Sequence, residues 1–358
     1  MNIKKLKLKE LNRAYATACL SIDHKDYILY ASESTVGVPG FAYAYNLDDI
    51  EHPEIVWNNA GGCMGIIQHP FKQNCFLAVQ EFYLKENPSK AKIVEGNRKN
   101  DGTWEIKDIV HLPLVHRIGI LRDNENAYLI ACTVARQKDD KDDWSKPGEI
   151  WGGKISKDQM SFFICFIFFC LPHKPFHLSL LKTGLFKNHG FYQYKDNDKD
   201  KICIGTDNGA YIIYIDNKEI RIKKILDGHI GEVALHDINQ DGKLELITIE
   251  PFHGNKIHIY QENKQGIYEP IWTYQNEIEF AHALTGGSLL GKECFIAGVR
   301  KGKGEVFTVF YKNGNYETYE IDQGVGPANL CIIHHKNKDY ISCANHTIHE
   351  CALYEIKK

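Results

Sequence analysis

Residues 186–225 read FKNHGFYQYKDNDKDKICIGTDNGAYIIYIDNKEIRIKKI, and residues 231–272 repeat the same plan as GEVALHDINQDGKLELITIEPFHGNKIHIYQENKQGIYEPIW. Each stretch contains four short apolar runs separated by turns, and the second begins about 45 residues after the first. A repeat of about 40 to 50 residues that holds four strands is typical of a β-propeller blade. Because one four-stranded sheet cannot bury both of its faces alone, several such units must stack around an axis.

The same unit can be followed along the whole chain. Its starts fall near residues 14, 60, 114, 186, 231, 276 and 323. The seventh unit lacks an outermost strand, whereas Ile3 to Leu11 is a strand-like segment without a unit. We therefore predict an all-β, seven-bladed β-propeller in one domain, 1–358, in which residues 3–12 complete the last blade and leave no long sheet edge unpaired. The alternative is a six-bladed ring in which the third unit is split.

Composition restricts the classes of partner. The chain has 358 residues, of which 43% are hydrophobic, and closed β arrays of this length commonly form one domain. The net charge is −3 and no basic stripe is present, so we expect neither a nucleic-acid nor an anionic-membrane partner. The oligomeric state is left open by the sequence.

The compartment is inferred from the first residues and the cysteines. Met1 to Glu10 alternates Lys with Ile or Leu and does not resemble a signal peptide. The 11 cysteines include no C-x-x-C pair and fall largely within predicted strands, which favours free thiols in the cytoplasm. The apolar run Ser161 to Leu171 is shorter than the roughly 20 residues that cross a bilayer as a helix. We interpret it as strand in the third blade rather than as a membrane contact.

One turn has the spacing of a calcium loop. Asp237, Asn239, Asp241 and Glu245 occupy relative positions 1, 3, 5 and 9, and Gly242 at position 6 permits the sharp turn. Oxygen ligands at alternate positions are what Ca²⁺ requires, so the sequence predicts bound Ca²⁺ or Mg²⁺ with a structural role. The alternative is an acidic Asx-turn without an ion.

A second set of polar residues falls where inner strands begin or where second strands end, positions that line the channel of a propeller. The set comprises Glu81, His116, Arg136, His189, Glu232, Glu250, His253, His282, Arg300, Asn329 and His346. We predict that His189, His253 and Glu250 hold Zn²⁺, Mn²⁺ or Fe²⁺, because imidazole is a common ligand of these ions. A single His at a strand start is more often an ordinary polar residue, but the Gly that follows His189 and His253 lets a ligand approach the backbone.

Short peptides give a family resemblance. The turn 237–245 resembles the D-x-D-x-D-G-x-x-D turn of FG-GAP or VCBS-type propeller repeats. Together with KNHG at 187–190, EPFHG at 250–254 and GPAN at 326–329, it resembles the propeller domain of aldos-2-ulose dehydratases. That resemblance implies metal-assisted β-elimination of water from a keto sugar, with histidines as ligands or base. Those enzymes also carry cupin domains, which this chain lacks, so an isomerase step attributed to a cupin is not expected.

Two functions follow from these features. The first is a metal-dependent carbon–oxygen lyase or isomerase acting on a small keto sugar, with His116 or His282 as acid or base and Arg136 or Arg300 holding substrate oxygens. The second is a non-catalytic propeller that binds a protein or glycan partner. Geometry discriminates between them: an enzyme requires the imidazoles to face one shared, accessible site, whereas in a binding module they diverge.

Overall fold

The middle strands of each sheet and its outermost strand differ in how deeply they are buried. Strands in the middle of a sheet are mostly apolar and buried, and β7 (Cys75–Gln80) is buried throughout, because both of its faces pack against neighbouring sheets. The outermost strands alternate, as in β17 (Glu219–Leu226), because one face meets solvent. The computed structural model describes residues 1–35, 37–84, 88–123, 126–155 and 176–358. The apolar run 161–171 lies outside these residues.

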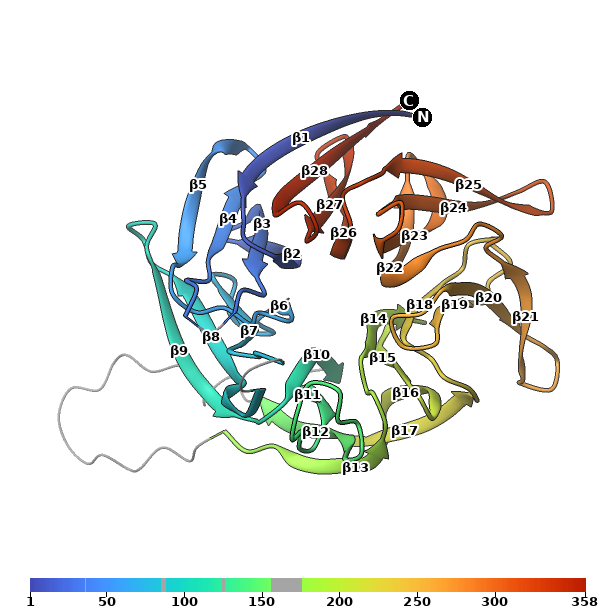
Figure 1. Cartoon of the computed structure of the whole chain (residues 1–358), viewed down its shortest axis with the longest axis horizontal. Helices are drawn as coiled ribbons and strands as arrows, with labels where there is room; N and C mark the ends of the chain where they lie inside the picture. The colour runs from blue at the N-terminus through green and yellow to red at the C-terminus, as the bar shows by residue number, and fades with distance from the viewer. Residues whose placement is uncertain (36, 85–87, 124–125, 156–175) are drawn as a thin grey trace.

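The strands form seven four-stranded antiparallel sheets arranged around a central axis, which confirms the predicted seven-bladed propeller (Figure 1). We call the region where the inner strands meet at this axis the channel. In order from the channel outward, blade 1 contains β2 (Ala14–Ile22), β3 (Lys25–Ser32), β4 (Ala42–Asn46) and β5 (Asp49–Trp57); blade 2 contains β6 (Ile66–Gln68), β7, β8 (Lys92–Arg98) and β9 (Trp104–His111); blade 3 contains β10 (Val115–Asp123), β11 (Asn126–Ala135), β12 (Pro147–Ile155) and β13 (Ser179–Leu185).

The remaining blades follow the same order. Blade 4 contains β14 (Gly190–Asp196), β15 (Lys199–Thr206), β16 (Gly209–Asp216) and β17; blade 5 contains β18 (Glu232–His236), β19 (Glu245–Glu250), β20 (Lys256–Glu262) and β21 (Tyr268–Thr273); blade 6 contains β22 (Glu279–Leu289), β23 (Lys292–Lys301), β24 (Val306–Lys312) and β25 (Asn315–Asp322); blade 7 contains β26 (Pro327–His335), β27 (Lys338–Asn345), β28 (Glu350–Lys357) and β1 (Asn2–Glu10). One short 3₁₀ helix, Pro88–Lys90, precedes β8.

The first strand closes the ring, as predicted. β1 pairs antiparallel with β28, so that Ile3 lies opposite Ile356 and Leu6 opposite Leu353 (Figure 1). Lys5 adds ion pairs to Asp322 at 2.9 Å and to Glu350 at 2.8 Å. The closing strand therefore joins the two ends of the described chain through backbone hydrogen bonds, apolar packing and charge.

The hydrophobic core is divided among the interfaces between consecutive blades. The described residues form seven buried clusters: six join two neighbouring blades, and the seventh joins blades 2 and 3 with Tyr15 of blade 1 and Ala328 of blade 7. Between blades 3 and 4, for example, Leu121 and Ile130 pack with Ile202 and Ile213. Burial of apolar surface between the sheets thus holds the ring together, as expected for units that cannot bury both faces alone.

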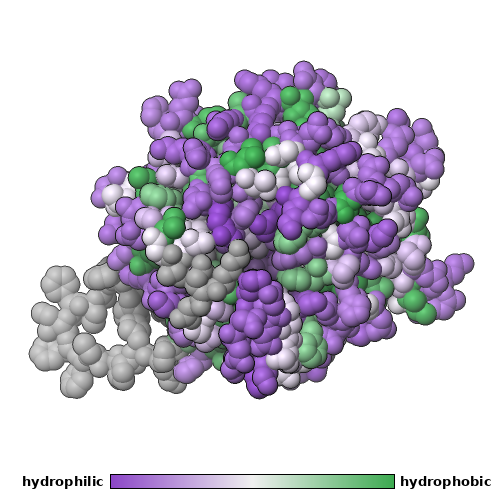
Figure 2. Space-filling view, in the orientation of Figure 1, coloured by the Kyte–Doolittle hydropathy of each residue, from purple (hydrophilic) through white to green (hydrophobic). Residues whose placement is uncertain are grey.

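The surface is mainly polar. The face seen along the channel axis is dominated by hydrophilic residues, with small separate apolar patches between them (Figure 2). No helix in the described residues is long and apolar enough to span a membrane. The nine cysteines in that part of the chain are free thiols.

Candidate active site at the channel

Six of the seven inner strands, all except that of blade 5, begin with the same backbone conformation. The residue two positions before the channel adopts a positive φ: 50° at Arg13, 62° at Gly62, 61° at Leu114, 47° at Lys187, 61° at Phe280 and 56° at Gly326. A β-bulge follows at Tyr15, His116, His282 and Ala328, where the pairing register shifts. Bulges re-aim side chains next to functional sites. We call Tyr15, Met64, His116, His189, Gly231, His282 and Ala328 the channel positions, one from each blade.

Backbone carbonyls at the channel positions hold side chains of the preceding blade. His189 Nδ1 donates to Gly231 O at 3.2 Å, and His282 Nδ1 donates to Ala328 O at 2.7 Å. Asn329 of blade 7 donates likewise to Tyr15 O at 2.7 Å. A carbonyl oxygen can only accept, so Nδ1 of both imidazoles carries the proton. The lone pair is therefore on Nε2 of His189 and on Nε2 of His282.

Three imidazoles converge close enough to share a metal ion. His189, His253 and His282 each offer a ligand atom within 4.8 Å of the others. They come from blades 4, 5 and 6, and their ring centroids are 4.9 to 5.2 Å apart. His253 Nε2 is buried and has no hydrogen-bond partner. Because a buried polar atom without a partner is costly, these residues fit an ion such as Zn²⁺, which binds imidazole nitrogen readily.

His253 is held between two aromatic rings. Its centroid lies 3.8 Å from that of Phe252 and 4.3 Å from that of Phe280, both in stacked geometry. The backbone of His253 has φ 50°, an uncommon conformation for a bulky residue. Packing on both faces thus fixes the orientation of the imidazole.

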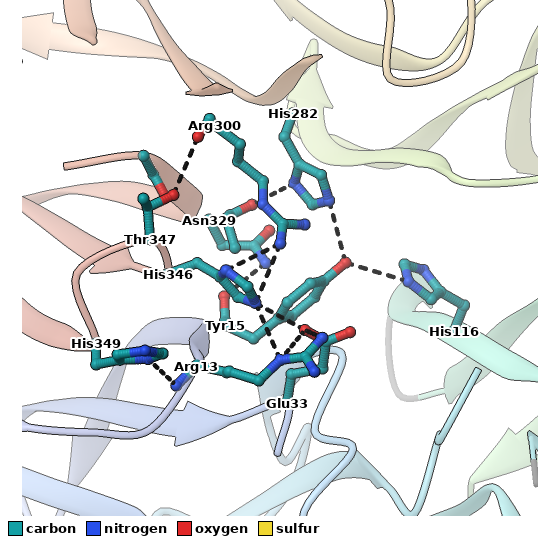
Figure 3. Close-up of polar contacts among 12 residues, drawn as sticks. Arg13, Tyr15, Glu33, His116, His282, Arg300, Asn329, His346, Thr347 and His349 are labelled. Carbon is teal, nitrogen blue, oxygen red and sulfur yellow. Dashed lines mark hydrogen bonds and ion pairs between the residues drawn. The ribbon is translucent and has the colours of Figure 1, made fainter. Parts of the chain in front are cut away.

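Tyr15 connects the metal-site candidates to His116. Its hydroxyl lies 3.3 Å from His282 Nε2 and 3.3 Å from His116 Nε2 (Figure 3). Without a metal, the hydroxyl donates to the lone pair on His282 Nε2, and the Tyr15 oxygen accepts from His116 Nε2. A metal held by His282 would take the place of this Tyr15 hydrogen bond, because Nε2 has one lone pair. His116 Nδ1 is then an acceptor, and it is buried without a partner. Tyr15 and His116 form a short chain along which a proton can move.

Burial keeps the imidazoles of the site neutral. It lowers the pKa of His116, His189 and His282 well below 6.5, and the charge of Arg117 acts in the same direction. Burial, reinforced by the charge of Arg300, lowers the pKa of His253 to about 3. Neutral imidazole is the form that binds a metal or accepts a proton.

Two carboxylates and three guanidinium groups surround the imidazoles. Arg117 Nη2 lies 3.3 Å from Glu232 Oε2, and Arg13 Nη2 lies 2.6 Å from Glu33 Oε2. Burial raises the pKa of Glu232 to about 7, although Arg117 opposes this effect. Burial also acts to raise the pKa of Glu33, but the hydrogen bond from His346 and the charge of Arg13 outweigh it, so that the pKa is about 2. Arg300 Nη2 donates to His346 Nδ1 at 2.9 Å.

Four of the residues predicted from the sequence lie in this cluster: His116, His189, His253 and His282. Arg300 lies beside it (Figure 3). Glu250, predicted as a metal ligand, is turned away: its carboxylate accepts from Thr248 at 2.7 Å and from Tyr260 at 2.8 Å. Arg136 is exposed after β11, and none of its hydrogen bonds or ion pairs joins it to the four imidazoles.

Tyr15, Arg13, Glu33 and Arg117 were missed by the sequence analysis. Tyr15 lies at the start of the inner strand of the first unit, which is the position that histidines occupy in other units. Tyr15 would have been included if every polar side chain at this position had been considered. Arg13 and Glu33 flank β2 and β3 of blade 1, and they carry no comparable signal, because only the packing of blade 1 against blade 7 brings them to His346.

The turn 237–245 satisfies its own polar groups. Asp237 accepts from the backbone N–H groups of Asp241 at 3.1 Å and Gly242 at 2.9 Å. Asn239 Nδ2 donates to Glu245 at 3.0 Å. Burial, with repulsion from Asp241, raises the pKa of Glu245 to about 7. The contacts are those of an Asx-turn, and the Ca²⁺ or Mg²⁺ predicted here stays a prediction.

Comparison with known proteins adds no family. No protein-family model matches the sequence, and no curated protein matches it either. The residues of the channel are therefore the basis for inferring a function.

Proposed function

We propose that the protein is a metal-dependent carbon–oxygen lyase or isomerase that acts on a small keto sugar. The observation that carries this proposal is the convergence of His189, His253 and His282, three neutral imidazoles from separate blades. We assign to them a divalent transition metal, Zn²⁺, Mn²⁺ or Fe²⁺. Such an ion, when bound, polarises a substrate carbonyl.

The chain's own residues would supply the proton transfers. In β-elimination a base removes the proton next to the carbonyl, the β carbon–oxygen bond breaks, and the departing hydroxyl takes up a proton to leave as water. We assign these transfers to His116 and Tyr15, which share a hydrogen bond. His282, the other candidate acid or base, belongs to the group that would hold the metal.

Access to the site requires a movement. His116 and His189 are 3% exposed and His282 is 1% exposed. Trp144, from the loop between β11 and β12, packs on Phe252 with 5.2 Å between ring centroids, and Phe252 covers His253. The proposal therefore includes displacement of the Trp144 loop when substrate enters.

The experiment has two parts. Elemental analysis of protein purified without chelators should give about one transition-metal ion per chain. The metal-loaded protein should then convert a member of a keto-sugar panel, with the unsaturated carbonyl product followed by ultraviolet absorbance or an isomer followed by chromatography. Absence of both the metal and turnover would refute the proposal.

A second function, a propeller that binds a protein or glycan without catalysis, is favoured by one observation. A groove of about 660 Å³ at the rim of blades 5 and 6 is lined by Phe310, Tyr311 and Tyr319 together with Lys292 and Lys312. Aromatic rings beside polar groups suit a sugar ring. Glycan binding that is lost in Tyr319→Ala but retained in His189→Ala would support this alternative. The free thiols fit our expectation of a cytoplasmic protein under either function.

A further inference from the structure

Arg300 differs from the two other guanidinium groups of the channel in its partners. Arg13 pairs with Glu33 at 2.6 Å, and Arg117 pairs with Glu232 at 3.3 Å. Among the described residues, Arg300 has no carboxylate within ion-pairing distance. Its side chain bonds only to the imidazole of His346: Nη2 donates to Nδ1 at 2.9 Å and lies 3.1 Å from Nε2.

The His346 imidazole does not neutralise Arg300. Its Nε2 lies 2.8 Å from Glu33 Oε2, which can only accept, so Nε2 carries the proton and Nδ1 accepts from Arg300. Burial lowers the pKa of His346, against the effect of Glu33, so the ring is uncharged at neutral pH. One positive charge in the channel therefore remains without a counter-charge.

That charge lies next to the proposed metal site. The Arg300 guanidinium carbon is 5.1 Å from the centroid of Phe280, and Phe280 stacks on His253. The guanidinium also points toward Tyr15 and His282 (Figure 3). Arg300 is half-buried, and a charge that is partly removed from water gains from a counter-ion, so an anion bound here would be stabilised.

We propose that Arg300 binds a carboxylate of the substrate, so that the substrate class is a keto-sugar acid. This inference rests on the proposed function and makes its substrate more specific. A planar guanidinium matches a carboxylate with two parallel N–H···O bonds. A single uncompensated charge suits a monoanion better than a phosphate dianion, which would call for further donors.

A carboxylate bound at Arg300 would also fix how the reacting atoms of the substrate are oriented. With the acid group on Arg300 and the carbonyl toward the three imidazoles, the proton between carbonyl and leaving group lies toward Tyr15 and His116. Loss of that proton, cleavage of the carbon–oxygen bond and release of water balance without an oxidant or reductant. Arg300 would act by orienting the substrate.

Three compounds test the inference: 5-keto-D-gluconate, a keto-sugar acid; D-fructose, its neutral counterpart; and D-fructose 6-phosphate. Titration calorimetry with Zn²⁺-loaded protein should show 5-keto-D-gluconate binding at least about tenfold more tightly than D-fructose, as expected for a charge-assisted pair. Arg300→Gln should abolish this preference, and Arg300→Lys should retain part of it because the charge remains.

Lys301→Gln is the matched control. Lys301 Nζ lies 5.1 Å from the same Phe280 ring but is exposed and is 3.6 Å from Glu279, so its removal should leave the preference unchanged. Equal affinity for D-fructose, tighter binding of the phosphate, no binding of 5-keto-D-gluconate, or an unchanged preference in Arg300→Gln would each overturn the inference.

Repeating the titration after chelation separates the two proposals. If the metal proves absent but the preference for the carboxylate still depends on Arg300, the metal-based function fails and the anion site stands. If the metal is present and the preference is missing, only the anion site fails.

Discussion

The histidines of the channel and the turn 237–245 both have the spacing of metal ligands. They differ in how many of their polar atoms lack a hydrogen-bond partner. In the turn, donors and acceptors from nine consecutive residues, with Gln261, satisfy one another. In the channel, imidazoles from separate blades meet, and His116 Nδ1 and His253 Nε2 remain buried without partners.

The difference indicates where a ligand has most to gain. An unsatisfied buried polar atom costs about 1 to 3 kcal/mol, and a ligand that pairs with it recovers this cost. A turn whose oxygens already accept N–H groups must exchange those bonds for an ion. Tight binding is therefore expected in the channel and weaker binding in the turn.

The largest effect is expected from the double variant His189→Ala/His253→Ala. Removing two of the three imidazoles should lower metal affinity by about 100-fold or more and abolish turnover. Elemental analysis after dialysis measures the change. His334→Ala, an exposed histidine outside the cluster, is the control and should keep full occupancy. If the double variant retained its metal, the channel histidines would not be the metal ligands, and the expected difference in metal binding between the channel and the turn would be refuted.

Tyr15→Phe should separate proton transfer from metal binding. The variant keeps the ring but loses the hydroxyl shared by His116 and His282, so we expect turnover to fall about 100-fold. Metal content should not change. Tyr319→Phe, at an exposed position, should have wild-type turnover. Normal activity in Tyr15→Phe would exclude the phenol from the reaction.

The pH dependence of stability should have opposite signs in the two regions. In metal-free protein, the pKa of His253 is about 3 in the folded state against 6.5, so the unfolded state binds the extra proton and stability falls as pH drops from 6.5 toward 3. The pKa of Glu245 is about 7 against 4.5, so the folded state keeps its proton and stability falls as pH rises from 4.5 toward 7.

Urea unfolding of chelated protein between pH 4.5 and 7 measures both contributions. Glu245→Gln should remove the loss of stability at the upper end of this range. It should leave the loss on acidification in place. An identical profile in the variant and the wild type would show that Glu245 does not titrate in this way.

A smaller effect is expected from calcium. If the turn binds Ca²⁺, a tenfold excess over the dissociation constant raises the free energy of unfolding by about 1.4 kcal/mol. Thermal unfolding with and without Ca²⁺ measures this gain, and Asp237→Asn should reduce it. A gain of equal size in Asp237→Asn would assign the ion to another site.

The smallest effect is expected at Gly242. Its φ is 86°, and an added Cβ would meet no neighbouring atom, so Gly242→Ala tests backbone conformation alone. We expect a loss of about 1 kcal/mol of unfolding free energy. Gly65→Ala is the matched control, because its Cβ also meets nothing and its φ is not positive. Equal losses in both variants would mean that the turn places no special demand on Gly242.

The fold was predictable because its signal is periodic. Four apolar runs per unit repeat along the chain, and the unpaired lysine-rich first strand indicated how the ring closes. The entry to each inner strand was not predictable: Arg13, Leu114, Lys187 and Phe280 adopt positive φ although none is glycine. Tertiary packing imposes that conformation, and composition does not reveal it.

The candidate site was only partly predictable. The histidines were found because imidazole is unusual at a strand start, whereas Tyr15 was missed because tyrosine is ordinary in a strand. Glu250 was assigned to the metal from its place at a strand end. Residues i and i+2 of a strand share a face, so Glu250 shares a face with Thr248 and bonds to it.

The carbonyl contacts at the channel positions make the site depend on the circumference of the ring. Arg117 of blade 3 contacts the blades on both sides: its Nη1 donates to Met64 O of blade 2 at 3.1 Å, and its Nε donates to His189 O of blade 4 at 3.4 Å. A small change in the tilt of any blade would alter several imidazole orientations together. Weaker pairing of β1 with β28 should therefore lower the activity of the channel residues under conditions in which the sheets are still folded.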